Sequence, residues 1–256
     1  GVQNIIAMSQ QAGVQKVIFT SSDKAVNPTN VMGTTKLLGE KLITAANSNK
    51  LPAKTIFAST RFGNVLGSNG SVIPIFHNQI SLGGPVTLTD KNMTRFVMSI
   101  EESVRLIIQS ATLAKGGDVF ITKMPVILIK DLAKAMIAEL APKYGLNAHS
   151  IQINEIGIKP GEKLYEELVS SEEVRRVIEQ DEDYILLPAF SSMYNHVEYD
   201  YPKVKRTPLK SPYISCLDNA IDVDSLKNLL HKNKLFKKPT IDKNSRYWPG
   251  DKEEKN

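Results

Sequence analysis

The chain has 256 residues, of which 41% are hydrophobic and 23% are charged, and its 32 basic and 27 acidic side chains give a formal net charge of +5. This composition is typical of a soluble globular protein with a sizeable core, in one large domain or two small ones. The single cysteine, Cys216, excludes an internal disulfide and a cysteine-cluster metal site and suits a reducing compartment, so we expect a cytoplasmic protein. The longest apolar runs, such as residues 125–129, are far too short to cross a bilayer.

The surplus of positive charge favours a small anionic ligand, such as a nucleotide diphosphate, over a nucleic acid. No stripe of lysine or arginine interleaved with aromatic residues is visible. Part of the surplus lies in a lysine-rich stretch at residues 232–238, which is typical of solvated surface. The four histidines are scattered and have no partner pattern, so we expect no metal site.

Helical and strand patterns alternate along the first half of the chain, which indicates parallel βαβ units. In chain order the patterns predict a helix at 2–11 closed by Gly13, a buried strand at 16–21, a helix at 28–47, a strand at 55–61, a helix at 71–82, a strand at 85–89, a helix at 99–113, a strand at 119–122, a helix at 129–144 and a strand at 151–153. A further helix is predicted from Lys163. Short strands and proline-rich turns follow residue 170, with one more helix at 222–231.

Two of these helices are amphipathic, and we expect their apolar sides to face the core. The side chains concerned are Leu38, Leu42 and Ala45 in helix 28–47 and Ile100, Val104, Ile107 and Ile108 in helix 99–113. Asn27 and Pro28 suit the N-cap and the first turn of the earlier helix. The whole pattern predicts an α/β fold: the C-terminal part of a doubly wound parallel sheet, with a small C-terminal lobe that begins at residue 171.

Residues 20–36, with the sequence TSSDKAVNPTNVMGTTK, form the most informative motif. A strand ends in hydroxyl side chains that are followed by an adjacent acid and base, Asp23 and Lys24. The next helix carries Met32 and Lys36 four residues apart, and therefore on one face. A strand end with an acid–base pair that faces a helix lysine is the layout of a sugar-nucleotide active site.

Four motifs occur in order along the chain: SSDKAVNPTNVMGTTK, RFGNVLGSNGSVIPIF, LTDKNMTRFVMS and GIKPGEKLYEEL. Together they resemble the extended short-chain dehydrogenase/reductase enzymes of bacterial polysaccharide biosynthesis. The most similar group is the UDP-N-acetylglucosamine (UDP-GlcNAc) 4,6-dehydratases of capsule and flagellin-glycan synthesis. The resemblance implies a Rossmann-type fold, an NAD or NADP cofactor, a UDP-sugar substrate and a homo-oligomer, either a dimer or a hexamer.

The resemblance also implies catalytic roles. Asp23 and Lys24 match the acid and base of the dehydration step, Ser22 matches a hydroxyl residue that hydrogen-bonds the sugar's 4-hydroxyl, and Lys36 matches the lysine that holds the nicotinamide ribose. Met32 stands where most of the superfamily has a tyrosine that takes the C4 hydroxyl proton. A thioether cannot act as a base, so we expect Met32 to contribute shape only. The C4 base stays unassigned, with Asp23 and Lys24 as candidates.

The remaining motifs match ligand-binding positions of the family. The substrate contacts implied are Asn64, Ser71, Val72, Ile73, Thr87, Arg95, Lys159 and Glu162, and the cofactor contacts are Ser21, Lys36 and Phe62. Arg95 supplies the forked donor that phosphate prefers. Lys159 stands where relatives usually carry arginine, which removes one bidentate contact. Glu162 accepts hydrogen bonds from the ribose hydroxyls.

One family motif has no counterpart here, namely the GxxGxxG turn that binds the dinucleotide pyrophosphate. Gly63, Gly67 and Gly70 follow a strand, but they match the family's substrate loop. We therefore expect residues 1–170 to form an incomplete NAD(P)-binding domain, interleaved with substrate-binding segments, that belongs to a longer enzyme and binds NAD(P) poorly alone. The choice between NAD and NADP stays open.

Two other functions remain open. A UDP-sugar epimerase would need no Asp23–Lys24 pair, so changing these residues would spare it and abolish a dehydratase. A non-catalytic UDP-sugar-binding fragment would bind substrate without turnover. The leading prediction is the 4,6-dehydration of UDP-GlcNAc to a UDP-4-keto-6-deoxy sugar for surface polysaccharide synthesis, with inversion or retention at C5 undecided.

Overall fold

The computed structural model describes residues 1–47, 55–68, 70–189, 197–205 and 209–237. The helices in these ranges are α1 Val2–Gln11, α2 Val31–Ala46, α3 Val72–Ser81, α4 Ile100–Leu113, α5 Ile129–Leu140 and α6 Val223–Lys232. The strands are β1 Lys16–Ser22, β2 Ile56–Phe62, β3 Asn64–Val65, β4 Val86–Leu88, β5 Thr94–Met98, β6 Val119–Thr122, β7 Val126–Leu128, β8 Ile153–Glu155, β9 Glu167–Val169, β10 Val177–Glu179, β11 Asp183–Leu186 and β12 Tyr213–Ile214. Most predicted elements are confirmed, and of the lysine-rich stretch at 232–238 only residue 238 lies outside the described residues.

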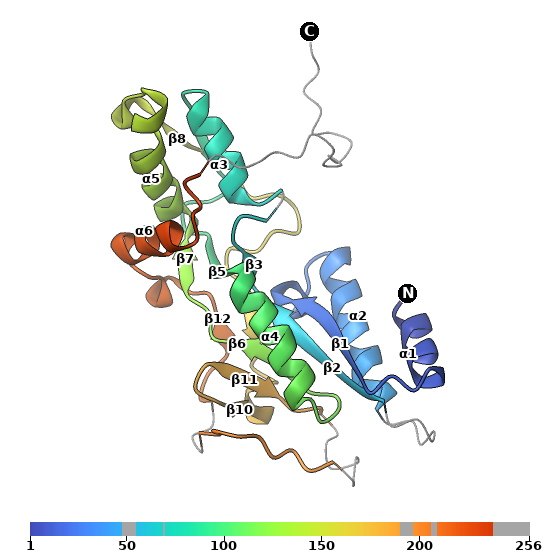
Figure 1. The fold of residues 1–256 in the computed structure, drawn as a ribbon. Helices are drawn as coiled ribbons and strands as arrows, with labels where there is room; N and C mark the ends of the chain where they lie inside the picture. Colours follow the sequence, from blue (N-terminus) through green and yellow to red (C-terminus); the bar gives the residue numbers. More distant parts are fainter. Residues whose placement is uncertain (48–54, 69, 190–196, 206–208, 238–256) are drawn as a thin grey trace.

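Five strands form the main sheet, in the order β1-β2-β6-β11-β10 (Figure 1). Strands β1, β2 and β6 run parallel, as expected for βαβ units, and β11 and β10 extend the sheet with antiparallel pairing. The predicted α/β fold with a parallel sheet is confirmed. Strands β10 and β11 follow the boundary predicted at residue 170 and still complete this sheet, and a domain boundary at that residue stays a prediction.

Strand β1 lies at the edge of the sheet, which corrects the prediction of a buried strand. Five of its seven side chains are half-buried, and one edge of the strand pairs with β2. Helix α2, with α1 beside it, packs on one face of β1 and β2, and α4 packs on the other face (Figure 1). The carboxyl ends of β1 and β2 therefore come together between layers of helices.

Helix α2 begins at Val31, three residues later than predicted. Asn30 is its N-cap, since the Asn30 side chain accepts a hydrogen bond from the N–H of Gly33 at 2.9 Å. Asn27, the predicted cap, has a φ of +44° and lies outside the helix. The Asn-Pro signal marked a turn that precedes the helix, because the left-handed backbone at Asn27 is incompatible with a helical start.

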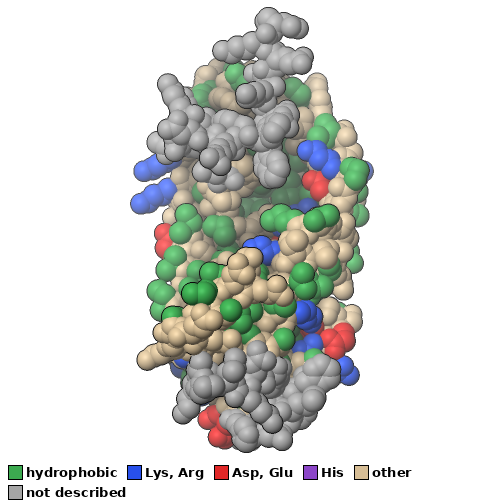
Figure 2. All heavy atoms as spheres, turned by 90° about the vertical axis from the view of Figure 1, so that its right-hand side faces the viewer, with side chains coloured by type: hydrophobic (Ala, Val, Ile, Leu, Met, Phe, Trp, Pro, Cys, Tyr) green, Lys and Arg blue, Asp and Glu red, His purple; other side chains and the backbone are tan. Residues whose placement is uncertain are grey.

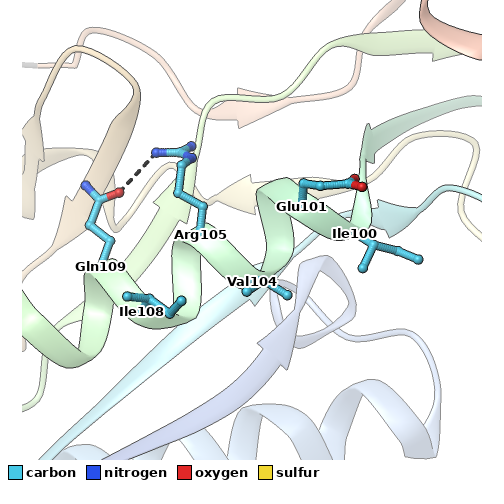
Figure 3. Close-up of a pocket in the computed structure, with 6 residues that line it drawn as sticks. All are labelled: Ile100, Glu101, Val104, Arg105, Ile108 and Gln109. Carbon is cyan, nitrogen blue, oxygen red and sulfur yellow. Dashed lines mark hydrogen bonds between the residues drawn. The ribbon is translucent and has the colours of Figure 1, made fainter. Parts of the chain in front are cut away.

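The apolar sides predicted for α2 and α4 do not face the core. The exposed or half-buried members are Leu38, Leu42, Ala45, Ile100, Val104, Ile107 and Ile108. In α4 the most exposed are Ile100 and Ile108, at 59% and 62%. Figure 3 shows Ile100, Val104 and Ile108 along one side of the helix, while Arg105 donates a hydrogen bond to Gln109 at 3.0 Å.

The buried sides contain one large apolar residue each, Ile43 in α2 and Leu106 in α4, and small residues beside them. A Cβ added to Gly39 would lie 2.4 Å from the ring of Phe19, and a Cβ added to Gly33 would lie 2.3 Å from the backbone oxygen of Lys24. These glycines let α2 approach β1 and the turn after it more closely than any side chain permits. In α4 the buried residues are Ser103, Leu106 and Ser110. Close packing, and not the largest apolar stripe, decides which side of each helix is buried.

A second lobe packs around its own apolar core. Helices α3, α5 and α6 contribute to this core together with the parallel pair β4–β8. A small sheet in the order β3-β5-β7 lies between this lobe and the main sheet (Figure 1). The turns that bear the later motifs therefore lie at the junction of the two lobes.

The helix predicted from Lys163 is wrong. Residues 167–169 form β9, which pairs with β12. Glu166, just before β9, is 4% exposed, whereas Glu167 is half-buried and its carboxylate accepts a hydrogen bond from Asn27 at 2.5 Å. Successive side chains of an extended segment point to opposite faces, so the adjacent carboxylates of Glu166 and Glu167 lie in different environments.

A buried ion-paired group, which we call the Arg61 cluster, joins Arg61 on β2 to Glu40 on α2 and to Glu173. The Arg61 guanidinium makes five hydrogen bonds of 2.7–3.0 Å, four to the two carboxylates and one to the carbonyl of Leu168. Although burial opposes it, hydrogen bonding to Arg61 lowers the pKa of Glu173 to about 2. The cluster fixes β2, α2 and the chain that follows β9 relative to one another.

Exposed apolar side chains also occur on the α1–α2 side, which faces the viewer in Figure 2. They include Ile5, Met8 and Leu38, each more than half exposed. Within the described ranges, none of the helices is both long and apolar enough to span a membrane.

Candidate functional site

The turn after β1 holds a second charged group, which we call the Lys24 cluster and which consists of Lys24, Asp23 and Glu166. Asp23 and Lys24 form a short 3-10 helix, Asp23–Ala25, whose first N–H groups are capped by the Ser22 hydroxyl, 3.2 Å from the Lys24 backbone nitrogen. The Lys24 ammonium donates to Asp23 Oδ1 at 2.9 Å and lies 3.9 Å from Glu166 Oε1. One cation therefore lies beside two carboxylates.

Glu166 is buried in a strongly charged environment. Arg95 Nε lies 3.7 Å from Glu166 Oε1, and the Glu166 backbone N–H donates to the hydroxyl of Ser215 at 2.8 Å. Burial, followed by the nearby charge of Asp23, raises the pKa of Glu166 above its usual value of 4.5, although Lys24 and Arg95 oppose the shift. The Glu166 carboxyl group therefore holds its proton more strongly than an exposed glutamate does.

A pocket of about 240 Å³ opens beside the cluster. Its lining residues are Lys24, Thr29, Asn30, Asn64, Arg95, Gly161, Glu162, Lys163 and Glu166. The four predicted site residues that share this pocket are Lys24, Asn64, Arg95 and Glu162. The pocket joins the ends of β1, β3 and β5 to the turn at residues 159–163.

Hydrogen bonds hold that turn against the start of α2. The side chains of Thr29 and Asn30 both donate to the carbonyl of Gly161, at 2.9 and 3.2 Å. The Lys163 ammonium donates to the carbonyl of Val26 at 2.8 Å. These contacts make the 159–163 turn a wall of the pocket, even though about 130 residues separate it from α2.

Several buried polar atoms at the end of the sheet have no hydrogen-bond partner among the described residues. At this end they are Ser21 Oγ, Asp23 Oδ2, Asn64 Oδ1 and Glu166 Oε2, while others, among them Thr55 Oγ1, Ser71 Oγ and Gln180 Oε1, lie elsewhere in the fold. Such atoms are rare in folded proteins because each costs about 1–3 kcal/mol when it stays unpaired. Asp23 and Glu166 belong to the Lys24 cluster and Asn64 lines the pocket beside it, so this region keeps hydrogen-bonding capacity that a polar ligand can use. Within the same described ranges, no group of three or more His, Cys, Asp or Glu side chains is arranged to hold a metal ion.

The residues predicted to contact a nicotinamide cofactor lie on the same sheet end. Lys36 donates to the carbonyl of Thr20 at 3.0 Å and lies over the ring of Phe19. Ser21 is buried with an unpaired hydroxyl, and Phe62, which ends β2, is in register with the next residue, Ser22. Contacts of these residues with a nicotinamide stay predictions, and the chain's sequence has no GxxGxxG turn for the pyrophosphate of a dinucleotide.

Met32 is exposed to solvent, whereas Arg95 is nearly buried and hydrogen-bonded to the backbone. Met32 is 60% exposed at the start of α2, so it is not part of the core. Arg95 is nearly buried, and its guanidinium donates to the carbonyls of Thr94, Lys163 and Leu164. Most of its donors therefore fix the turn after residue 163, and phosphate contact by Arg95 stays a prediction.

The other predicted substrate residues lie around α3 and the 159–163 turn. Ser71 precedes α3 at its N-cap position, and Ile73 is buried in the core of the second lobe with Val72 packed against it. Thr87 on β4 accepts a hydrogen bond from Gln79 at 2.8 Å. None of these residues lines the pocket beside Lys24, so their ligand contacts stay predictions.

Lys159 and Glu162 belong to one tight turn. The Lys159 backbone N–H donates to the Glu162 carboxylate at 3.2 Å, and the Lys159 side chain is exposed. Sequence reasoning missed Glu166, Lys163 and the pair Thr29–Asn30. The alternation of an extended YEEL segment contained a usable signal for Glu166, since one of two adjacent acidic residues must then point inward.

The sequence matches the profile of a family described as polysaccharide biosynthesis protein over residues 1–188. The uncharacterized membrane protein MJ1061 of Methanocaldococcus jannaschii is 52% identical over 73% of this chain and 56% of its own length. The capsular polysaccharide biosynthesis protein CapD of Staphylococcus aureus is 48% identical over 68% of this chain and 28% of its own. The UDP-glucose 4-epimerase of Rickettsia massiliae is 38% identical over 90% of this chain and 65% of its own. The chain thus spans less than two thirds of the length of each of these relatives.

Two solved structures place the fold. The X-ray structure of Pen from Bacillus thuringiensis superposes with a TM-score of 0.80, at 42% identity, over 91% of this chain and 67% of that one. The dTDP-glucose 4,6-dehydratase of Bacillus anthracis, solved in complex with NAD, shares the fold alone, with a TM-score of 0.52 and 13% identity over 62% of this chain and 55% of that one. With its profile matched over residues 1–188, the chain belongs to the family of polysaccharide biosynthesis proteins, and its fold is that of the extended short-chain dehydrogenase/reductases.

Proposed function

We propose that this chain carries the acid–base and sugar-nucleotide site of an NAD(P)-dependent UDP-GlcNAc 4,6-dehydratase. The observation that carries the proposal is the Lys24 cluster, an adjacent acid and base with unpaired buried oxygens beside a pocket. Such a pair suits two proton transfers on one substrate. The capsular protein CapD among the relatives supports a role in surface polysaccharide synthesis.

The residues have separate tasks in this reaction. When bound, the dinucleotide supplies oxidation at C4 and reduction at C6. Ser22 hydrogen-bonds the 4-hydroxyl and Lys36 holds the nicotinamide ribose. Lys24 then removes the C5 proton, which the 4-ketone acidifies, and an acid protonates the departing C6 hydroxyl. Asp23 is the acid that the family resemblance assigns, and it holds Lys24 in place at 2.9 Å.

The test combines calorimetry with product analysis. UDP-GlcNAc is titrated into the chain, and the reaction with NAD+ or NADP+ is followed by mass spectrometry for a sugar nucleotide that has lost one water. Asp23→Asn and Lys24→Ala should each lower product formation about a hundredfold or more. The matched controls are Asp131→Asn and Lys134→Ala, which change a surface acid–base pair 3.3 Å apart and should leave the rate unchanged.

A second candidate is a UDP-sugar 4-epimerase, which the 38% identity to the Rickettsia enzyme favours. An epimerase would yield a product of unchanged mass and would tolerate Asp23→Asn. Binding of UDP-GlcNAc with no product would favour a binding fragment instead. The predicted homo-oligomer and the cytoplasmic location stay predictions, and light scattering measures the former.

A further inference from the structure

We propose that Glu166 is a further catalytic residue, which carries the proton that leaves with the C6 hydroxyl and so frees Lys24 to act as the base at C5. The proposal deepens the dehydratase function and rests on it. It starts from the unequal contacts of the Lys24 ammonium, which lies 2.9 Å from Asp23 and 3.9 Å from Glu166, while Arg95 Nε lies 3.7 Å from Glu166. Two carboxylates therefore share one lysine, whose side chain is 35% exposed.

Position distinguishes the two carboxylates. Asp23 is fully buried and makes the shorter contact with Lys24, but it is not among the residues that line the pocket. Glu166 lines the pocket, and its Oε2 is buried without a hydrogen-bond partner among the described residues. Of the two groups, Glu166 is therefore the one with a free oxygen at the place where a sugar would bind.

The groups around Glu166 come from three elements. Asp23 and Lys24 face it from the turn after β1, Arg95 faces it from β5, and Lys163 acts from the turn before β9. Burial is the largest influence on the Glu166 pKa and raises it, and Asp23 adds to the shift against the three cations. When the Glu166 carboxylate takes up a proton, the repulsion between the two carboxylates is relieved, which favours Glu166 as the acceptor of a proton from Lys24.

The proton transfers balance over the elimination. The Lys24 ammonium passes a proton to the Glu166 carboxylate, which leaves a neutral amine beside a carboxylic acid. The amine takes the C5 proton of the 4-ketosugar, the C5–H electron pair becomes the C5=C6 double bond, and the C6–O bond breaks. The Glu166 proton joins the departing hydroxyl to form water, so Lys24 is again an ammonium and Glu166 a carboxylate.

The first test measures the protonation of Glu166 without any turnover. Carbon-13 NMR of side-chain-labelled glutamate follows each carboxyl group against pH, and Glu166→Gln assigns the signal. We expect Glu166 to titrate above the ordinary range near 4.3. Glu167→Gln identifies the neighbouring carboxyl as an internal reference. A Glu166 signal that titrates at or below the ordinary range overturns the proposal.

The second test uses the same variants with UDP-GlcNAc and the dinucleotide. Glu166→Gln should bind UDP-GlcNAc as the unaltered chain does, lower kcat about 10²–10⁴-fold, and remove one limb of the pH–rate profile. Glu167→Gln should change none of these. A Glu166→Gln variant with unchanged kcat, or with a lower kcat and an unchanged pH profile, contradicts the role of Glu166. If Glu166 titrates high and the unaltered chain releases no water from the sugar, the proposed function fails and not the protonation of Glu166.

Discussion

The Arg61 and Lys24 clusters each place one basic side chain beside two carboxylates, and in the Lys24 cluster Arg95 also approaches Glu166. In the Arg61 cluster all five guanidinium N–H groups donate hydrogen bonds of 2.7–3.0 Å. In the Lys24 cluster one contact is 2.9 Å and the other 3.9 Å, and both carboxylates keep an unpaired buried oxygen. The Arg61 cluster, in which every guanidinium donor is used, stabilises the fold. The Lys24 cluster still has oxygens that can accept a hydrogen bond from a ligand.

The choice of base follows from this difference. Arginine keeps its charge and its planar fork matches two carboxylates at once, which suits a permanent tie between β2, α2 and the chain after β9. Lysine is a flexible point charge that gives up its proton far more readily, which suits chemistry. The number of satisfied hydrogen bonds therefore assigns the Arg61 cluster a role in stability and the Lys24 cluster a role in chemistry. Three predictions test this assignment.

The largest expected effect is on stability and comes from Arg61→Met. This change leaves Glu40 and Glu173 buried without a cation, which should lower the free energy of unfolding by about 3–5 kcal/mol. Urea denaturation followed by circular dichroism measures it. The matched control is Arg175→Met, which removes an exposed pair with Glu172 and should cost at most about 1 kcal/mol. Equal losses in the two variants would show that the buried cluster has no special role.

The second-largest effect is expected from acid, which should lower the free energy of unfolding by weakening the Arg61 cluster. The pKa of Glu173 is lowered from 4.5 to about 2 in the folded chain, so its contribution is present above pH 4.5 and is lost as the pH falls toward 2. The loss should amount to about 3 kcal/mol. Glu166 acts in the opposite direction, because its raised pKa favours the folded state in acid.

Urea denaturation at a series of acidic pH values measures this dependence. The Glu173→Gln variant should have a flatter slope over the same interval, because it removes the titrating group. A slope identical to that of the unaltered chain would assign the acid sensitivity to other carboxylates.

The smallest effect is expected in the Lys24 cluster. Asp23→Asn removes a charge from a fully buried site in which one oxygen has no partner, and this gain offsets the loss of the contact to Lys24. The free energy of unfolding should change by less than about 1 kcal/mol in either direction. A loss as large as that of Arg61→Met, measured under the same conditions, would place Asp23 among the structural groups.

Much of the fold follows from sequence periodicity, and the failures have physical causes. Strand β6 and helix α1 lie where the pattern predicts them, because buried strands and capped helices have strong local signals. The inner faces of α2 and α4 bury Ile43 and Leu106, but also Gly39 and Ser110, which are buried for their small size and not for their hydrophobicity. Periodicity favours large apolar side chains and overlooks such contacts.

The site divides in the same way. Asp23 and Lys24 are adjacent in the sequence, so their pairing is visible in the motif itself. Glu166 joins them from more than 140 residues away and only because β9 is a strand, which the helix predicted from Lys163 concealed. A prediction from the neighbouring sequence alone would place this charged residue on the surface, and only the tertiary fold explains its burial.

The close approach at Gly33 and Gly39 limits how this site can be redesigned. Any side chain at Gly33 would collide with the backbone oxygen of Lys24, and one at Gly39 with the ring of Phe19, over which Lys36 lies. The inner face of α2 is therefore closed to variation, while its outward positions are free to change. A mutant library meant to alter specificity should vary Met32 and keep both glycines, because the sequence space open to this helix lies on its solvent side.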